Sequence, residues 1–385
     1  MNATLTSLFE PLHIRDLTVA NRFVMSPMNR NFAPGGIPSI EIGQYYRRRV
    51  DGETALIVTG GIGIDHPTAI GVAGERDCNV PELHGAAIDG WRKIVDLVHA
   101  GGGKIIAQLW HQGPMRLPGT GYHPDVPPGR PSGVWGPTTG RRSSFDEATR
   151  ARFAEETRPL TDAEIIEIVE AYGRSAGNAA AVRFDGIEIH GSHGYLPDAF
   201  FWEETNLRTD RWGGGRRERS RFGAEVVRSV RRAVGERLPI FFRFGQSKPQ
   251  DLDAKLARTP AELEEVLGPL ADAGVDVFDA QQFVFDLPEF PGSDLNLAGW
   301  AKKLTSRLSM TGGAVGLSRG MSDPNASGPP APFNNLDALA QRLERGEFDL
   351  VAVGRSLLQD AAFARTARLG LPFADYDPSK LRALS

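Results

Sequence analysis

The chain is poor in cysteine, in long apolar runs and in net charge. Cys78 is the only cysteine in 385 residues, which rules out an internal disulfide framework and is typical of a reducing compartment. Apolar runs such as residues 55–58 and 105–109 are far shorter than the roughly 20 residues that cross a membrane. The first residues lack the basic-then-apolar pattern of a secretory signal. These absences predict a soluble, cytoplasmic protein without a membrane partner.

The charges nearly cancel. The chain has 44 Lys and Arg against 48 Asp and Glu, a formal net charge of −4. So small a value argues against nucleic acid or an anionic membrane as the main partner, although a local basic pocket stays compatible with it. We therefore expect small-molecule partners, and the sequence leaves the choice between a monomer and a homo-oligomer open.

What the sequence does contain is a regular alternation of short apolar runs and amphipathic segments. The strand-like runs are residues 22–26, 55–60, 104–110, 186–190, 239–245, 275–280, 308–313 and 349–354, and the helical patterns are residues 40–49, 85–100, 162–181, 217–234, 260–273, 336–345 and 357–369. Strands joined by helices pair in parallel, and eight of them close a barrel. The predicted fold is α/β, a single-domain (β/α)8 TIM barrel over residues 1–385.

A doubly wound sheet is the alternative fold. It is disfavoured because no G-x-G-x-x-G fingerprint follows an early strand: residues 61–63 come closest, but His66 stands where the third glycine belongs. Two segments interrupt the regular spacing. Residues 112–160, after the third strand, predict a long loop or cap insertion over the barrel mouth, and the aromatic, proline-rich residues 282–300 predict a loop that walls a cavity or packs on the rim.

The sequence His190-Gly191-Ser192-His193-Gly194-Tyr195 follows the fourth apolar run directly. The glycines at 191 and 194 let the chain turn sharply, so that both imidazoles and the phenol can point inward. Such a group suits a substrate carbonyl that gains negative charge during reaction. A structural histidine cluster is one alternative. Zinc is the other, but no third ligand with metal-site spacing lies nearby, so we predict no metal.

Two glycine-containing turns predict a phosphate site. Gly313 and Ala314 end the seventh strand, while Gly354 and Arg355 end the eighth. The loops after these strands bind phosphate recurrently in TIM barrels, where backbone N–H groups and a cation hold the anion. A Gly-Gly turn alone is equally an ordinary strand exit, and only the pairing of the two turns favours phosphate.

Arg243 lies within the aromatic run 240–244. A guanidinium buried there needs an anionic partner, which is either a structural carboxylate or a ligand that becomes more negative during turnover, as the pyrimidine part of a flavin does. Gln108, which carries both a donor and an acceptor, suits the same ring edge. An amide, a cation and a phosphate site for one ligand point to FMN.

With these residues in place, the chain resembles the Old Yellow Enzyme family of FMN-dependent ene-reductases along nearly its whole length. The similar motifs are residues 8–12 (LFEPL), 21–28 (NRFVMSPM), 108–113 (QLWHQG), 190–195 (HGSHGY) and 206–214 (NLRTDRWGG). The resemblance implies an enzyme that takes hydride from NADH or NADPH and reduces the C=C bond of an α,β-unsaturated carbonyl compound.

The resemblance also implies residue roles. Tyr195 would be the proton donor, His190 and His193 would hold the carbonyl oxygen, and Trp110 would line the substrate cavity. The residues implied to contact FMN are Pro27, Asn29, Gly60, Gln108, Arg243, Gly313, Ala314, Gly354 and Arg355.

The sequence departs from the family pattern at several positions. Asn29 stands where relatives usually carry Thr or Cys, which leaves the flavin potential and the reaction direction open; Trp212 and residues 245–248 (GQSK) also differ from the common pattern. An FMN-dependent dehydrogenase or demethylase of the same fold, which oxidises its substrate, is therefore the main alternative. A flavin-free lyase or hydrolase that uses His190 and Tyr195 as acid and base, and a non-catalytic FMN binder, are the others.

Overall fold

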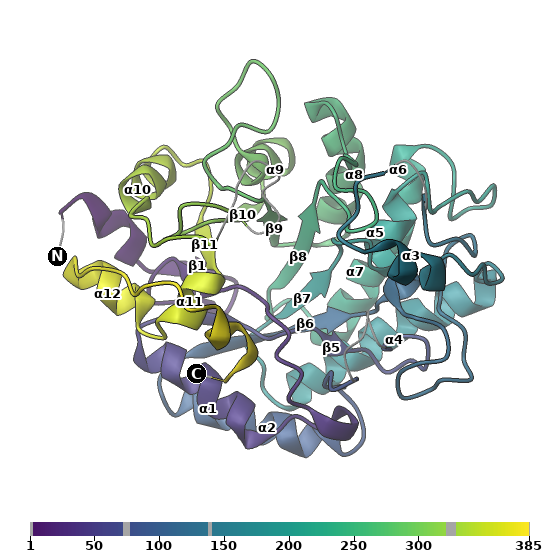
Figure 1. Cartoon of the computed structure of the whole chain (residues 1–385), viewed down its shortest axis with the longest axis horizontal. Helices are drawn as coiled ribbons and strands as arrows, with labels where there is room; N and C mark the ends of the chain where they lie inside the picture. The colour runs from purple at the N-terminus through teal and green to yellow at the C-terminus, as the bar shows by residue number, and fades with distance from the viewer. Residues whose placement is uncertain (1–2, 72–77, 138–140, 321–328, 385) are drawn as a thin grey trace.

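The computed structural model describes residues 3–71, 78–137, 141–320 and 329–384. Eight parallel strands close into a barrel because the last strand pairs with the first, so the predicted TIM barrel is confirmed (Figure 1). In order around the barrel the strands are β3 (Phe23–Met25), β4 (Leu56–Val58), β6 (Lys104–Trp110), β7 (Ile187–His190), β8 (Ile240–Gly245), β9 (Val277–Gln281), β10 (Leu308–Gly312) and β11 (Leu350–Val353).

Helices follow each strand and surround the barrel (Figure 1). They are α1 (Ile40–Asp51), α2 (Ala87–His99), α4 (Asp162–Ala181), α7 (Arg221–Val234), α8 (Pro260–Ala273), α9 (Leu297–Thr305), α10 (Leu336–Glu344), α11 (Arg355–Gln359) and α12 (Phe363–Leu369). Thr161 begins α4 with a capping box that it forms with Glu164, which satisfies two otherwise free N–H groups. Among the described residues, none of the helices combines the length and apolar character that a membrane span requires.

Three of the predicted segments differ from the structure by more than a few residues at their ends. The helical pattern at 217–234 is divided at Ser220 into α6 (Arg216–Arg219) and α7, and the pattern at 357–369 is divided into α11 and α12. The segment 282–300, predicted as a loop, contains the start of α9. Its side-chain cap is Asn296, whose oxygen accepts from the N–H of Gly299.

The barrel strands alternate strictly between two apolar layers. Ile105 and Ala107 on β6 pack outward with the helices, while Ile106 faces the barrel interior. The same alternation puts Phe242 outside and Phe241 inside on β8. Because side chains repeat every two residues along a strand, Gln108 lies on the inward side two residues beyond Ile106.

An apolar layer closes the amino-terminal end of the barrel. The hairpin of β1 (Leu12–Ile14) and β2 (Leu17–Val19) packs its buried side chains against inward residues of the barrel strands. Arg15 at the turn of the hairpin is paired with Asp276, just before β9, at 2.6 Å. This end of the interior is therefore sealed, and any cavity must open at the other end.

The insertion after β6 has a small core of its own. It includes η3 (Gly113–Met115) and α3 (Glu147–Phe153). Trp135 stacks on Phe153 with ring centroids 5.5 Å apart, and Phe145 packs beside both. The remaining short elements are η1 (Ala3–Phe9), η2 (Pro34–Gly36), β5 (Ile62–Gly63), α5 (Leu196–Phe201) and η4 (Pro378–Arg382).

Candidate active site

A cavity of about 840 Å³ opens at the carboxyl-terminal end of the barrel strands, the end that carries the active site in TIM-barrel enzymes. Nine of the residues singled out in the sequence line it: Pro27, Asn29, His193, Tyr195, Arg243, Gly313, Ala314, Gly354 and Arg355. Gly60, Gln108, Trp110 and His190 are not among its lining residues. Ser144 and Phe145 of the 112–160 insertion line the cavity from one side.

The turn after β7 brings its two imidazoles and its phenol together. The ring centroids lie 4.7 Å apart for His190 and Tyr195, 5.5 Å for the two histidines, and 6.2 Å for His193 and Tyr195. Trp110 stacks on His190 at 6.2 Å and meets Tyr195 edge-on at 4.9 Å. Trp110 therefore supports the cluster from behind, and His193 and Tyr195 lie at the cavity wall.

The backbone of this turn has an uncommon conformation. His193 has a φ of 59° and Gly194 a φ of 72°, a region that side chains with a Cβ rarely occupy. A Cβ at residue 194 would collide with the side-chain amide of the buried Gln250, and together with the positive φ this contact favours glycine there. Such a strained turn persists only where its surroundings hold it in place.

A buried ion pair holds the turn. Asp198 accepts a hydrogen bond from the Gly194 N–H at 2.7 Å and another from Nζ of Lys248, also at 2.7 Å. Both charged side chains are fully buried. The sequence analysis missed this pair, although it marked residues 245–248 as a departure from the family pattern. The hydroxyl of Ser192, 3.0 Å from Nδ1 of His193, was missed as well, and its position between the two histidines was the available signal.

The surroundings keep all three groups uncharged at neutral pH. Desolvation, together with the positive charges of Arg243 and Lys248, lowers the pKa of His193 to about 3. Desolvation also holds the pKa of His190 well below its ordinary value and raises the pKa of the Tyr195 phenol. The site therefore presents two neutral imidazoles and a protonated phenol, which can donate hydrogen bonds to an oxygen or carbon that becomes negative.

Arg243 has the structural carboxylate that its sequence position called for, and it also faces the cavity. Its guanidinium donates to Asp279 on β9, and it also lines the cavity. Gln108 is bound within the protein: its Nε2 donates to Oε1 of Glu188 at 2.7 Å. Neither carboxylate was anticipated from the sequence.

The turns after β10 and β11 meet at the cavity, as the sequence predicted. Gly354 has φ −102° and ψ −99°, and a Cβ there would have no protein atom nearer than 3.8 Å. Arg355 donates to the carbonyl of Arg319 at 2.8 Å. Nε of Arg319 is buried without a hydrogen-bond partner among the described residues. Desolvation lowers the pKa of Arg355, and the positive charge of Arg319, a residue that the sequence analysis missed, contributes to this lowering.

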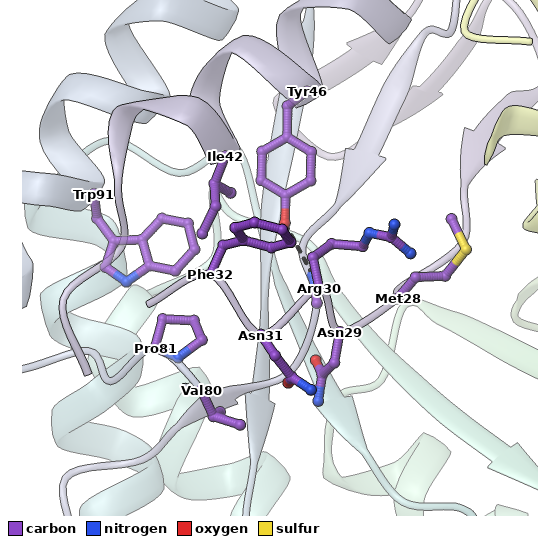
Figure 2. Close-up of a pocket in the computed structure, with 11 residues that line it drawn as sticks. Met28, Asn29, Arg30, Asn31, Phe32, Ile42, Tyr46, Val80, Pro81 and Trp91 are labelled. Carbon is purple, nitrogen blue, oxygen red and sulfur yellow. Dashed lines mark hydrogen bonds between the residues drawn. The ribbon is translucent and has the colours of Figure 1, made fainter. Parts of the chain in front are cut away.

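A smaller pocket adjoins the main one around Asn29. Figure 2 shows Asn29 and Phe32 with Tyr46 and Trp91 around it. Its volume of about 20 Å³ accommodates little more than a water molecule. Gly60 donates its backbone N–H to the Tyr46 hydroxyl at 3.1 Å, and a Cβ at residue 60 would lie 2.8 Å from Oδ1 of Asn29. Gly60 is thus required by close packing at the edge of the site.

Comparison with known proteins identifies the family. Residues 7–282 match the model of the NADH:flavin oxidoreductase / NADH oxidase family. The chain belongs to this family. The expected resemblance to the Old Yellow Enzyme family is confirmed, and the family implies FMN as the cofactor.

Several relatives are similar over most of the chain. It is 29% identical to an NADH oxidase of Thermoanaerobacter brockii over 94% of this chain and 51% of that protein. It is 37% identical to the rice 12-oxophytodienoate reductase 7 over 59% of this chain and 56% of that protein. The chain thus spans about half the length of these two relatives. It is also 28% identical to an NADPH dehydrogenase of Bacillus subtilis over 94% of both chains.

Among solved structures, morphinone reductase superposes with a TM-score of 0.75 at 26% identity, over 97% of this chain and 92% of that one. An old yellow enzyme homologue from Zymomonas mobilis superposes with a TM-score of 0.77 at 22% identity, over 98% and 97% of the two chains. The latter likeness supports the fold alone.

The residues present fit the FMN that the family implies. The cavity volume is typical of a cofactor site. At Gly354 the protein itself fills none of the space that a side chain would take. Arg355 at the cavity wall supplies a guanidinium for a phosphate, and Arg243 supplies a cation for the ring.

Proposed function

We propose that this protein uses FMN and NADH or NADPH to reduce the C=C bond of α,β-unsaturated carbonyl compounds or similarly activated alkenes. The observation that carries the proposal is the convergence of two neutral imidazoles and a protonated phenol at the wall of a cofactor-sized cavity. The names of relatives support a reductase, because they include 12-oxophytodienoate reductases and morphinone reductase.

In this proposal His190 and His193 hold the carbonyl oxygen of the substrate. Each neutral imidazole has one N–H donor, and a Ser192 hydroxyl that donates to Nδ1 of His193 leaves the proton of that ring on Nε2. Two donors aimed at one oxygen stabilise the negative charge that builds on it, and each such donor typically contributes roughly 3–4 kcal/mol in the transition state.

Tyr195 delivers the proton that completes the reduction. A phenol with a raised pKa is fully protonated at neutral pH, and it transfers its proton to a strongly basic α-carbon. Trp110, packed edge-on against Tyr195, orients the ring and restricts the substrate on that side. The insertion 112–160 acts as a cap, with Phe145 excluding water from the cavity.

FMN supplies hydride transfer between the nicotinamide and the alkene when it is bound. Pro27 and Asn29 would contact the ring from β3, with Gly60 and Gln108 behind them and Arg243 at the pyrimidine edge. Gly313, Ala314, Gly354 and Arg355 would hold the phosphate by backbone N–H groups and a guanidinium.

The decisive experiment separates the two half-reactions in Tyr195→Phe. Purified protein is expected to be yellow and to retain FMN. In stopped-flow measurements, reduction of the flavin by NADH or NADPH should stay within twofold of the wild type, because no proton is needed from residue 195. Reoxidation by cyclohexenone should slow by about 10²–10⁴-fold, the usual contribution of a general acid. Equal losses in both half-reactions would contradict the proton-donor role.

An FMN-dependent dehydrogenase or demethylase is the second candidate, and Asn29 at the cavity wall keeps it open, because this amide stands where relatives usually carry Thr or Cys. The same stopped-flow experiment distinguishes the two, because an enzyme that oxidises its substrate would reduce its flavin with that substrate and reoxidise slowly with every enone tested.

A further inference from the structure

Four polar side chains lie on neighbouring strands in the barrel interior, at the cavity that Arg243 and Asp279 line. Gln108 on β6 donates to Glu188 on β7, and Arg243 on β8 donates to Asp279 on β9. We call these four residues the sub-flavin cluster. The two carboxyl groups are 0% and 1% exposed. Glu188 holds Gln108 and Asp279 holds Arg243, the two side chains expected at the pyrimidine edge of the flavin ring.

The two carboxyl groups also face one another. Oε2 of Glu188 and Oδ1 of Asp279 are buried and have no hydrogen-bond donor among the described residues. Both carboxyl groups lie inside the barrel, held by Gln108 and Arg243, and each is near enough to shift the pKa of the other. Carboxylate oxygens only accept, so two such oxygens without another donor can form a hydrogen bond with each other only when one group is protonated. Two buried carboxylates so close together do not both ionise.

Charge balance supports the same conclusion. Among the described residues, Arg243 is the cation that acts on both carboxyl groups, and it donates directly to Asp279. His190 and His193, which face Arg243 from β7 and the turn after it, are neutral. One positive charge thus faces a pair that carries one negative charge and one proton.

We propose that Glu188 and Asp279 share a single proton, and that this carboxyl pair positions Gln108 and Arg243 and fixes the charge that they present to the flavin. The inference rests on the proposed FMN site and deepens it, since it assigns the two positioning residues that set the reduction potential. Because the proton is shared, the pair balances Arg243 whichever carboxyl group carries the charge.

This arrangement makes a non-additive prediction. Reduction places negative charge on the pyrimidine part of a flavin, so the relative affinity for reduced and oxidised FMN depends on the net charge of the sub-flavin cluster. Glu188→Gln and Asp279→Asn each leave one carboxylate, which ionises and balances Arg243. The double variant leaves none.

Reduction potentials at pH 7 test the prediction in the FMN-loaded protein. Each single variant should change the ratio of affinities for reduced and oxidised flavin by less than threefold. The double variant should favour reduced flavin at least tenfold, which is about 30 mV for a two-electron couple. A tenfold change in Glu188→Gln alone would mean that both carboxylates are ionised in the wild type, and an unchanged double variant would mean that the pair does not act on the flavin. Either result overturns the proposal.

Infrared spectra of the flavin-free protein test the shared proton separately. The wild type should show a protonated-carboxyl C=O band that shifts in D2O and is absent from Glu188→Gln. Its presence in that variant would refute the proposal even if the double variant failed to fold. Asp276→Asn is the matched control: it removes an aspartate that pairs with Arg231 near the amino-terminal end of β9, so it should lower stability and leave the band and the potential unchanged. Failure of the wild type to bind FMN would defeat the proposed function, while this band would still decide the protonation.

Discussion

The two ends of the barrel interior differ in what the same strands bury. At the amino-terminal end the inward residues are apolar and packed against the β1–β2 hairpin, with Ile106, Phe241 and Val277 among them. Two residues further along these strands the inward positions hold Gln108, Arg243 and Asp279. Two residues along each strand therefore separate two levels of the barrel interior. We call the apolar level the floor, and the level that holds Gln108, Arg243 and Asp279 the charged level.

The two levels contribute differently to the free energy of folding and to ligand binding. Burying an apolar side chain of this size contributes about 1.5–3 kcal/mol, whereas burying a charge costs free energy even when it is paired. The floor therefore stabilises the barrel, and the charged level above it is retained for what it does to a ligand. Substitutions at the two levels should change different measurable quantities.

The largest expected effect on stability is at the floor. Phe241 is fully buried, and Phe241→Ala should lower the free energy of unfolding by about 3–5 kcal/mol, because it removes a large side chain and leaves a cavity. Denaturant unfolding measures this loss. The FMN reduction potential of the folded variant should equal that of the wild type. A large change in potential with little loss of stability would abolish the distinction between the two levels.

A smaller effect, on rate instead of stability, is expected at the carbonyl-binding histidines. His190→Ala and His193→Ala should each lower kcat for enone reduction by about 10²–10³-fold, because each removes a donor to the developing negative charge. Binding of phenolic ligands should weaken in both variants.

Trp110→Phe is the matched control for the histidine variants, since it keeps an aromatic ring against His190 and Tyr195 and should change kcat less than tenfold. If Trp110→Phe were as damaging as either histidine variant, the two imidazoles would be structural.

The sequence was most informative where a feature is local. Residues 104–110, 162–181 and 260–273 were predicted with the boundaries that β6, α4 and α8 have, because apolar periodicity and side-chain caps act over a few residues. The start of α9 was missed, since Pro288 and Pro291 suggest a loop and its one clear signal is the cap at Asn296.

Partners brought together by the closed barrel could not be predicted in the same way. Arg243 and Asp279 are 36 residues apart, Lys248 and Asp198 are 50 apart, and both pairs depend on the register between neighbouring strands or loops. The sequence indicated that a buried Arg243 needs an anion, but not which carboxylate provides it. The residue roles proposed for the cavity remain predictions until the variants are measured.

The smallest expected effect is the pH dependence of stability. The pKa of His193 is about 3 in the folded protein and about 6.5 in an unfolded chain. Between these pH values the unfolded state binds a proton that the folded state does not. The free energy of unfolding should therefore fall as the pH drops below about 6.5, by up to about 1.4 kcal/mol per pH unit, and His190, whose pKa is also lowered, adds to the slope. Tyr195 is protonated in both states over this range and contributes nothing.

Denaturant unfolding at pH 5 and pH 7 measures that slope, and it distinguishes the two levels of the barrel. His193→Asn removes a group that titrates only in the unfolded state, so its stability should fall less than that of the wild type between the two pH values. Phe241→Ala lowers stability at both pH values by the same amount, because no titrating group is lost from the floor. If the free energy of unfolding of His193→Asn fell between pH 7 and pH 5 as much as that of the wild type, the imidazole of His193 would be protonated in the folded protein. The neutral donor assigned to the carbonyl oxygen would then be wrong.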